Sequence, residues 1–270
     1  MPRMIIGSNW MIGYGHKTAS TDTLIRNKFA SAEAVADMLN AFLENGVDAV
    51  MCPMNGEAPF TQGIYLAMER TGKKLVIVDT PIINVDDTAQ ARREAEATIK
   101  NSKRLGATFC MPHHSSAEQL VNKNKQTMDR LPDYLSMIRD NGMVPGLSAH
   151  MPELIVYSDL NEYDVQTYVQ IYNCMGFLMQ VEIEYIHSVI MNAKKPVMSI
   201  KPMAAGRVTP FVGLTFAYAT LRDCDMVTVG CFSREEVVED IEIARAAIEK
   251  RAVHVDGRNS PHKTVIMQNS

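Results

Sequence analysis

The sequence has little that would tie the protein to a membrane or to a nucleic acid. None of its apolar runs approaches the roughly 20 residues that a membrane-spanning helix needs. Its 27 basic and 31 acidic residues give a net charge of −4, which lacks the basic excess that nucleic acids and anionic membranes attract. We therefore expect a small-molecule substrate as the partner, and neither a nucleic acid nor a membrane.

Signs of secretion are also missing. The N-terminus, MPRMIIGSNWMIGYG, has one arginine, a short apolar stretch and no small-residue cleavage site, so it predicts a first strand rather than a signal peptide. The five cysteines are odd in number, widely spaced and without a CxxC pair. This pattern favours reduced thiols over a disulfide framework and predicts a cytoplasmic protein.

What the sequence does contain is one repeated rhythm. A short apolar run is followed by a polar or Gly/Pro-marked junction and then by an amphipathic segment. The apolar runs predict eight strands, at 4–9, 48–53, 74–80, 107–112, 143–149, 177–183, 196–202 and 226–232. The amphipathic segments predict helices at 31–45, 58–73, 87–105, 115–141, 152–175, 184–195, 209–223 and 233–251.

Several helix ends are marked by residue type. Ser31 and Ser233 stand at N-cap positions, and Gly46 follows the last turn of the segment 31–45. The segment 233–251 carries acids in its first turn and bases in its last, as the helix dipole favours. Pro132 is expected to break or kink the segment 115–141.

Eight strands that alternate with eight helices predict a parallel sheet, and the closed solution is a (β/α)8 TIM barrel. We expect one such domain over 1–251, with an open doubly wound sheet as the alternative. No GxGxxG follows the first strand and no composition break marks a second domain. Residues 11–30 form a long first βα loop, a candidate lid, and 252–270 an irregular C-terminal tail. The tail could cross the barrel or pack against a second subunit of a homo-oligomer.

In this fold, active sites lie at the C-terminal ends of the strands. Because side chains alternate in and out along a strand, the last inward residue of each strand can be predicted. A charged residue that ends an apolar strand is costly if it is buried and unpaired, so several converging ones indicate a functional site. The predicted inward set is Asn9, Asp79, His113 or His114, His150, Gln180, Glu182 and Lys201.

A metal centre is the first hypothesis for this set. Its ligands would be Asp79, His113, His150 and Glu182, from four consecutive strands. Carboxylate and imidazole donors suit a divalent metal such as Mn, Zn, Fe or Mg, which polarises a carbonyl group. Lys201, Glu182 and His150 would be catalytic and move protons next to that carbonyl. This predicts an isomerase, epimerase or lyase that acts on a sugar or keto acid, in carbohydrate metabolism.

A metal-free reaction is the second hypothesis. A lysine between low-dielectric barrel walls loses its proton more easily, so Lys201 could form an imine with a ketone. Glu182 would carry the proton, as in a Schiff-base aldolase or dehydratase. An ion pair between Lys201 and Glu182 would weaken this hypothesis.

The last two βα loops could bind an anion. Barrels often bind phosphate between these loops, with backbone N–H groups and a helix N-terminus. Gly206, Arg207, Gly230 and Ser233 could form such a site, although they could equally be plain turn and cap residues. The full set of predicted substrate-binding residues is Asn9, His114, Gln180, Gly206, Arg207, Gly230 and Ser233.

Two stretches of the last quarter, KPMAAGRVTP and VTVGCFSREEVVEDIEIA, resemble the aldo/keto reductases. In that family this region holds the phosphate of a nicotinamide cofactor. The stretch VDTPIIN is similar to the family's strand-end Asp-Thr pair, which would place Asp79 there. The family's tyrosine a few residues beyond that Asp is absent, as is its lysine at the end of the next strand. The resemblance implies a reductase as a third hypothesis, and a ligand-binding barrel without catalysis is a fourth.

Overall fold

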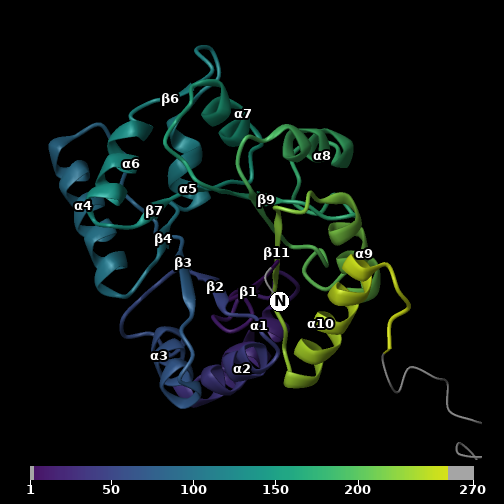
Figure 1. The fold of residues 1–270 in the computed structure, drawn as a ribbon. Helices are drawn as coiled ribbons and strands as arrows, with labels where there is room; N and C mark the ends of the chain where they lie inside the picture. The colour runs from purple at the N-terminus through teal and green to yellow at the C-terminus, as the bar shows by residue number, and fades with distance from the viewer. Residues whose placement is uncertain (1–2, 255–270) are drawn as a thin grey trace, which may run out of the picture.

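The computed structural model describes residues 3–254. Parallel strands lie at the centre and helices surround them (Figure 1). The strands of this sheet are β1 (Met4–Gly7), β2 (Ala49–Cys52), β3 (Val76–Asp79), β4 (Phe109–Cys110), β7 (Val144–Pro145), β8 (Leu147–Ser148), β9 (Tyr168–Ile171), β10 (Val197–Ile200) and β11 (Met226–Val229). This topology confirms the predicted α/β barrel of parallel strands.

The barrel closes at Gly146. This residue separates β7, which pairs with β4, from β8, which pairs with β9, so the two pieces are halves of one strand that changes partner. A Cβ atom at Gly146 would lie 2.8 Å from the Thr167 carbonyl oxygen and 2.6 Å from Met111 Cε. Only a residue without a side chain therefore lets the neighbouring strand approach closely enough to close the ring.

The helices are α1 (Ala19–Lys28), α2 (Ala32–Glu44), α3 (Pro59–Thr71), α4 (Ala89–Arg104), α5 (His114–Ala117), α6 (Leu131–Asp140), α7 (Glu153–Leu160), α8 (Ile183–Asn192), α9 (Pro210–Thr220) and α10 (Arg234–Glu249), with a 3-10 turn η1 (Glu118–Leu120). Two of the predicted caps are confirmed. Ser31 accepts a hydrogen bond from Ala34 N and Ser233 accepts one from Glu236 N, at the starts of α2 and α10. These bonds satisfy backbone donors that the first helical turn leaves unpaired.

The sixth barrel strand is not where the sequence predicted it. The structure places it at β9, inside the predicted helix 152–175, of which only α7 is helical. The predicted strand 177–183 is a loop that leads into α8. Tyr168–Ile171 pairs residue by residue with Val197–Ile200, and its alternation of aromatic, β-branched and polar side chains fits a strand. Residues 177–183 are similarly apolar but include Glu182 at the helix start.

Pro132 divides the segment 115–141 as predicted. The segment holds α5, η1, a small hairpin of β5 (Val121–Asn122) and β6 (Thr127–Met128), and then α6, which carries Pro132 in its first turn. The long first βα loop contains α1, which Thr18 caps by accepting a hydrogen bond from Thr21 N. Most of the predicted tail, 255–270, lies outside the described residues.

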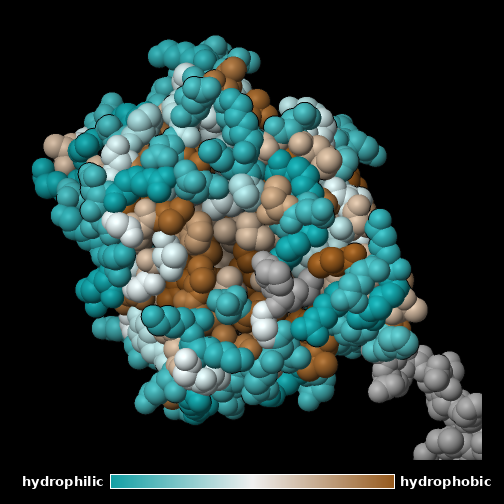
Figure 2. All heavy atoms as spheres, viewed as in Figure 1, coloured by the Kyte–Doolittle hydropathy of each residue, from teal (hydrophilic) through white to brown (hydrophobic). Residues whose placement is uncertain are grey.

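The sheet has two apolar faces. The barrel interior is filled by Ile5, Met51, Val78, Met111, Val169 and Met198. The larger core lies between the outer face of the sheet and the helices and includes Ile6, Val50, Ile77, Val197 and Val227. Figure 2 shows hydrophilic residues over the outside of the molecule and hydrophobic residues gathered toward the middle of this view.

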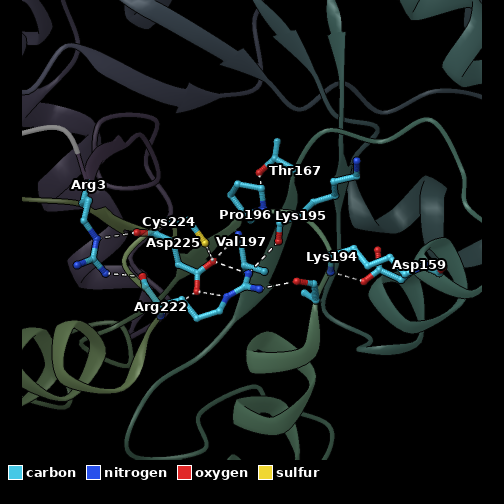
Figure 3. A network of polar contacts seen from close by, with 11 residues as sticks. Arg3, Asp159, Thr167, Lys194, Lys195, Pro196, Val197, Arg222, Cys224 and Asp225 are labelled. Atoms are coloured by element: carbon cyan, nitrogen blue, oxygen red, sulfur yellow. Dashed lines mark hydrogen bonds and ion pairs between the residues drawn. The ribbon is translucent and has the colours of Figure 1, made fainter.

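An ion-pair network holds the strand starts together (Figure 3). Asp225 is fully buried and accepts hydrogen bonds from Val197 N and from the guanidinium of Arg222, which lies 2.7 Å away at its nearest. Arg3 donates to the carbonyl oxygens of Asp225 and Arg222. Because it lies at the starts of β1, β10 and β11, away from the strand ends where the site is built, this network stabilises the fold.

No helix between residues 3 and 254 is long and apolar enough to cross a membrane. All five cysteines are free thiols, of which Cys52, Cys110 and Cys231 are buried.

Candidate active site at the barrel mouth

A cavity of about 910 Å³ opens at the C-terminal ends of the strands. Its lining comes from β1, β2, β8, β9, β10 and β11 and from loops at the C-terminal ends of the strands, including those after β3 and β4 and the loop 11–18. Of the predicted site residues, the structure brings Asn9, His113, His114, His150, Lys201, Gly206, Arg207 and Gly230 to this cavity. Apolar walls and a few polar groups are typical of small-molecule sites.

Three histidines from two neighbouring strand ends form the polar centre of the cavity. His113 and His114 follow β4, and His150 follows β8. The rings of His114 and His150 are stacked, with centroids 3.7 Å apart and planes at 19°. The rings of His113 and His114 are 4.2 Å apart. The sequence therefore predicted correctly that the two histidine stretches meet.

Glu118 completes this cluster. One carboxylate oxygen accepts hydrogen bonds from the backbone N–H groups of His150 and Met151, at 2.7 and 3.0 Å. The other lies 3.8 Å from Nδ1 of His114, one helical turn before it. His114, Glu118 and His150 each offer a ligand atom, and these atoms lie within 4.8 Å of one another, the only such group among the described residues.

Burial sets the protonation of this cluster. Burial, with the charge of the neighbouring His114 acting in the same direction, lowers the pKa of His113 and of His150 to about 4. At neutral pH these two imidazoles are therefore uncharged and keep a lone pair. Burial alone would raise the pKa of Glu118, but the nearby His114 ring and the hydrogen bonds from the backbone N–H groups of His150 and Met151 hold it below its ordinary value.

Lys201 reaches the cavity by a route that the sequence did not predict. Alternation along β10 puts Met198 toward the barrel axis and Val197 toward the helices, so the predicted inward face of this strand is wrong. Lys201 nevertheless lines the cavity because its backbone is left-handed, with φ of 60°, at the point where the strand ends. Burial lowers the pKa of its amine. Strain at a non-glycine residue of this kind is typical of functional sites.

Asp79 lies on the other face of its strand. Its neighbour Val78 points into the barrel, whereas the Asp79 carboxylate accepts hydrogen bonds from Met54 N, at 2.9 Å, and from Ser102 on α4. It does not line the cavity and does not join the histidines. Burial raises its pKa to about 6. The structure therefore does not bring together the predicted metal ligands Asp79, His113, His150 and Glu182. In β3 it is Val78 that faces the barrel interior, one residue before the predicted Asp79.

Gln180 and Glu182 are also absent from the cavity lining. Both are exposed in the loop before α8, with Glu182 at its N-cap, because the sixth strand is β9. The polar residue of the actual sixth strand, β9, is Gln170. It is buried on the outer face of β9, and its amide donates to the His150 carbonyl oxygen at 3.1 Å, so it supports the loop that carries His150.

The first βα loop lies against the loop after β10. Asn9 is 3.2 Å from His16, and Arg207 donates to the His16 carbonyl oxygen at 3.0 Å. A Cβ atom at Gly206 would be 2.7 Å from Nζ of Lys17, so the lysine lies directly over this glycine. The loop 11–18 thus forms one wall of the cavity, and its role as a lid stays a prediction.

The end of the cavity near α10 is acidic. Glu236, Glu239 and Asp240 line it, whereas Ser233 does not. The hydroxyl of Ser233 accepts from Glu236 N, and Glu236 accepts from Phe232 N at 2.6 Å, so side chains of this chain already cap the helix. Gly206, Arg207 and Gly230 of the predicted anion site line the cavity without Ser233, and anion binding there stays a prediction.

Comparisons with known proteins show the fold. No family model matches the chain, and no curated protein matches it. An aldo-keto reductase from Pseudomonas aeruginosa is similar in structure, with a TM-score of 0.64 and 14% identity over 91% of this chain and 90% of that one. An aldo-keto reductase from Klebsiella pneumoniae in complex with NADPH has a TM-score of 0.57 and 14% identity, over 95% and 88%. A structure described as native KDPGal has a TM-score of 0.50 and 15% identity, over 92% and 93%.

These comparisons correct one expectation. The similar structures with TM-scores of 0.57 and 0.64 are oxidoreductases, so the predicted class of isomerase or lyase is wrong. At 14% identity the similarity shows the fold alone. Whether a nicotinamide cofactor fits this chain depends on the residues that line its own cavity. The acidic, self-capped start of α10 does not fit the phosphate of a nicotinamide cofactor, and Arg207 stacks on Phe177 at 4.1 Å.

Sequence reasoning missed Glu118 and the acidic residues of α10. Glu118 stands four residues after His114, which places both on one face of a helix, and this spacing was a usable signal. Asp240 carries no such signal, because a buried acid in the middle of an amphipathic helix looks like any other polar residue there.

Proposed function

We propose that this chain is a metal-dependent enzyme that activates the carbonyl group of a small substrate at the barrel mouth. The observation that carries the proposal is the convergence of His114, Glu118 and His150, of which the two histidines line the cavity. Two imidazoles and one carboxylate, with open positions for substrate, are a donor set that zinc and iron enzymes use.

The ligand atoms need one adjustment to hold a metal ion. Two atoms bound to the same ion at about 2.1 Å are at most about 4.2 Å apart, whereas the three ligand atoms are spread over up to 4.8 Å. The lone pairs of an imidazole lie in the plane of its ring. The stacked rings of His114 and His150 therefore cannot both coordinate one ion until one of them rotates. A bound divalent cation would polarise the carbonyl oxygen of the substrate.

Lys201 is the residue of this chain that we assign to proton transfer. It enters the same cavity from the end of β10, close enough to lower the pKa of His113 and His150 by its charge. Burial makes its own amine less basic than that of an exposed lysine, which favours exchange of a proton with a carbonyl oxygen near neutral pH. Lys17 and Arg207 on the wall of the cavity favour a substrate with a carboxylate, such as a keto acid.

Metal binding tests the proposal directly. The protein, purified without chelator, is stripped with EDTA and titrated with Zn²⁺, Mn²⁺ and Fe²⁺ under argon. We expect one ion per chain, with an affinity that falls at least about tenfold in His114→Ala and in Glu118→Gln. His254→Ala, which removes an exposed histidine outside the cavity, is the control and should bind as the parent does.

Loss of the site has to be separated from loss of the fold. Circular dichroism spectra of the variants should match the parent, because His114 and Glu118 are only partly buried. Stoichiometric binding that is unchanged in both variants would place the metal elsewhere and overturn the proposal. Absence of binding in the parent, together with no turnover of a panel of keto acids and sugars, would leave a ligand-binding barrel.

A further inference from the structure

The cavity does not end at the histidines. It continues past Gly7 and Gly230 toward α10, where Glu236, Glu239 and Asp240 line it. A Cβ atom at Gly230 would lie 3.3 Å from Trp10 Cδ1, and one at Gly7 would lie 3.2 Å from Thr228 Cγ2. Side chains at these two positions would narrow the connection, so the glycines keep the acidic end joined to the barrel mouth.

Two oxygens in residues that line this cavity have no hydrogen-bond partner among the described residues. They are Oδ1 of Asp240 and Oγ1 of Thr228, in side chains of residues that are 3% and 8% exposed. The other carboxylate oxygen of Asp240 is 3.4 Å from Cys231 Sγ. Most buried polar atoms in native proteins are paired, and an unpaired one costs about 1–3 kcal/mol. Two of them on the lining of one cavity indicate that a ligand supplies the donors.

The negative charge at the α10 end of the cavity indicates which kind of hydrogen-bond donor a ligand would bring. Three carboxyl groups from neighbouring turns of α10 line it. The backbone hydrogen bond that Glu236 accepts from Phe232 leaves its negative charge in place. These carboxylates do not converge with a third ligand atom as a metal site would, since the only such group among residues 3–254 is the one at His114. An organic cation with several N–H donors therefore fits better than a metal ion or an anion.

We propose that this acidic end binds a protonated amino group of the substrate, with Asp240 and Thr228 accepting its hydrogen bonds. The substrate class is then a small carbonyl compound that carries an amine at its other end. This inference rests on the proposed function only in taking the cavity as the substrate site. The amine subsite is a property of metal-free protein, so it can be tested apart from the metal.

The test uses n-butylamine as the probe, with n-butanol as a matched compound that differs only in the head group. Each is titrated into EDTA-treated full-length protein at pH 8, and binding is followed by ¹H–¹⁵N NMR. We expect saturable binding of the amine and binding of n-butanol that is at least tenfold weaker. Asp240→Asn and Thr228→Val should each weaken amine binding at least threefold.

Two further variants make the outcome specific. Glu235→Gln removes an exposed charge from the same helix, outside the cavity, and should leave amine binding unchanged. His114→Ala should lose metal but keep the amine, which separates failure of the metal site from failure of this inference. Equal binding of n-butanol and n-butylamine, or amine binding that is the same in Asp240→Asn and Thr228→Val as in the parent, would overturn the proposal.

Discussion

The imidazole rings of His114 and His150 lie face to face, 3.7 Å apart, although 36 positions separate them in the chain. Glu118 links them, because it hydrogen-bonds the backbone N–H of His150 and lies one turn after His114. The residue that joins the two histidines thus begins η1, the 3-10 turn that leads into the hairpin of β5 and β6. This contact makes the rim between these strands the chemical centre of the cavity.

Metal binding should break this stack. Because the lone pairs lie in the ring planes, at least one of the two rings has to turn when both bind the same ion. We expect the imidazole ¹⁵N resonances of His114 and His150 to shift when Zn²⁺ is added, whereas those of His187 and His254 stay in place. Bound zinc with all four sets of resonances unmoved would show a different ligand set.

Lys201→Met should remove catalysis and leave metal binding intact. The amine is the proposed proton carrier, and positioned acid–base groups contribute roughly 10²–10⁴ to the rate. Turnover of the best substrate in a panel of keto acids should fall by about that factor, with one metal ion per chain retained. Lys74→Met, at an exposed lysine outside the cavity, is the control. A Lys201→Met enzyme with parental turnover would exclude the lysine from the reaction.

Asp240 should make the protein less stable as pH rises from about 4 to about 7. Burial, with the charge of Glu236 acting in the same direction, raises its pKa from 3.8 to about 7. Between these two values the folded state holds a proton that the unfolded state has lost, so the free energy of unfolding falls with pH and levels off above 7. At about 1.4 kcal/mol per unit the loss is at most about 4 kcal/mol.

Urea unfolding across pH 4–8 tests this dependence. Asp240→Asn should be more stable than the parent at pH 8 and should lose most of the slope. A smaller slope should remain and end near pH 6, because burial also raises the pKa of Asp79, to about 6. Parallel stability curves for the parent and Asp240→Asn would contradict the prediction.

Gly146→Ala should destabilise the barrel where it closes. The new methyl group would be 2.8 Å from the Thr167 carbonyl oxygen, which belongs to the backbone and cannot turn away. Overpacking of this kind costs about 1–3 kcal/mol in the free energy of unfolding. Gly72→Ala meets no atom within 4 Å and is affected only by its left-handed backbone, with φ of 66°. Urea midpoints should therefore fall further for Gly146→Ala, and equal midpoints would argue against strand closure at this residue.

The network around Arg222 and Asp225 should matter for stability alone. Asp225 is fully buried, and removal of one partner from a buried ion pair costs about 3–5 kcal/mol. Arg222→Met should therefore lower the free energy of unfolding by several kcal/mol. Because the pair lies at the starts of the strands, metal affinity of the folded variant should match the parent, and a loss of metal binding without a loss of stability would contradict this.

Local sequence was enough to predict the barrel and its better-marked elements. The apolar runs, the caps at Ser31 and Ser233, and Pro132 at a break depend on residues close together in the chain, so they can be identified without coordinates. The meeting of His113 and His114 with His150 also followed, because parallel strands of a barrel end at the same rim.

Only the tertiary structure decided which side chains share the cavity. The phase of a strand is set by its neighbours: a shift by one residue sends Asp79 to the helices, and a misplaced strand removes Gln180 and Glu182 from the rim. Lys201 enters through a left-handed residue that alternation does not describe. The sequence by itself determined the periodic pattern of apolar segments, since burial of those segments depends on local composition. Pairing register and loop conformation arise from contacts between distant segments, and they determined the chemistry of the mouth.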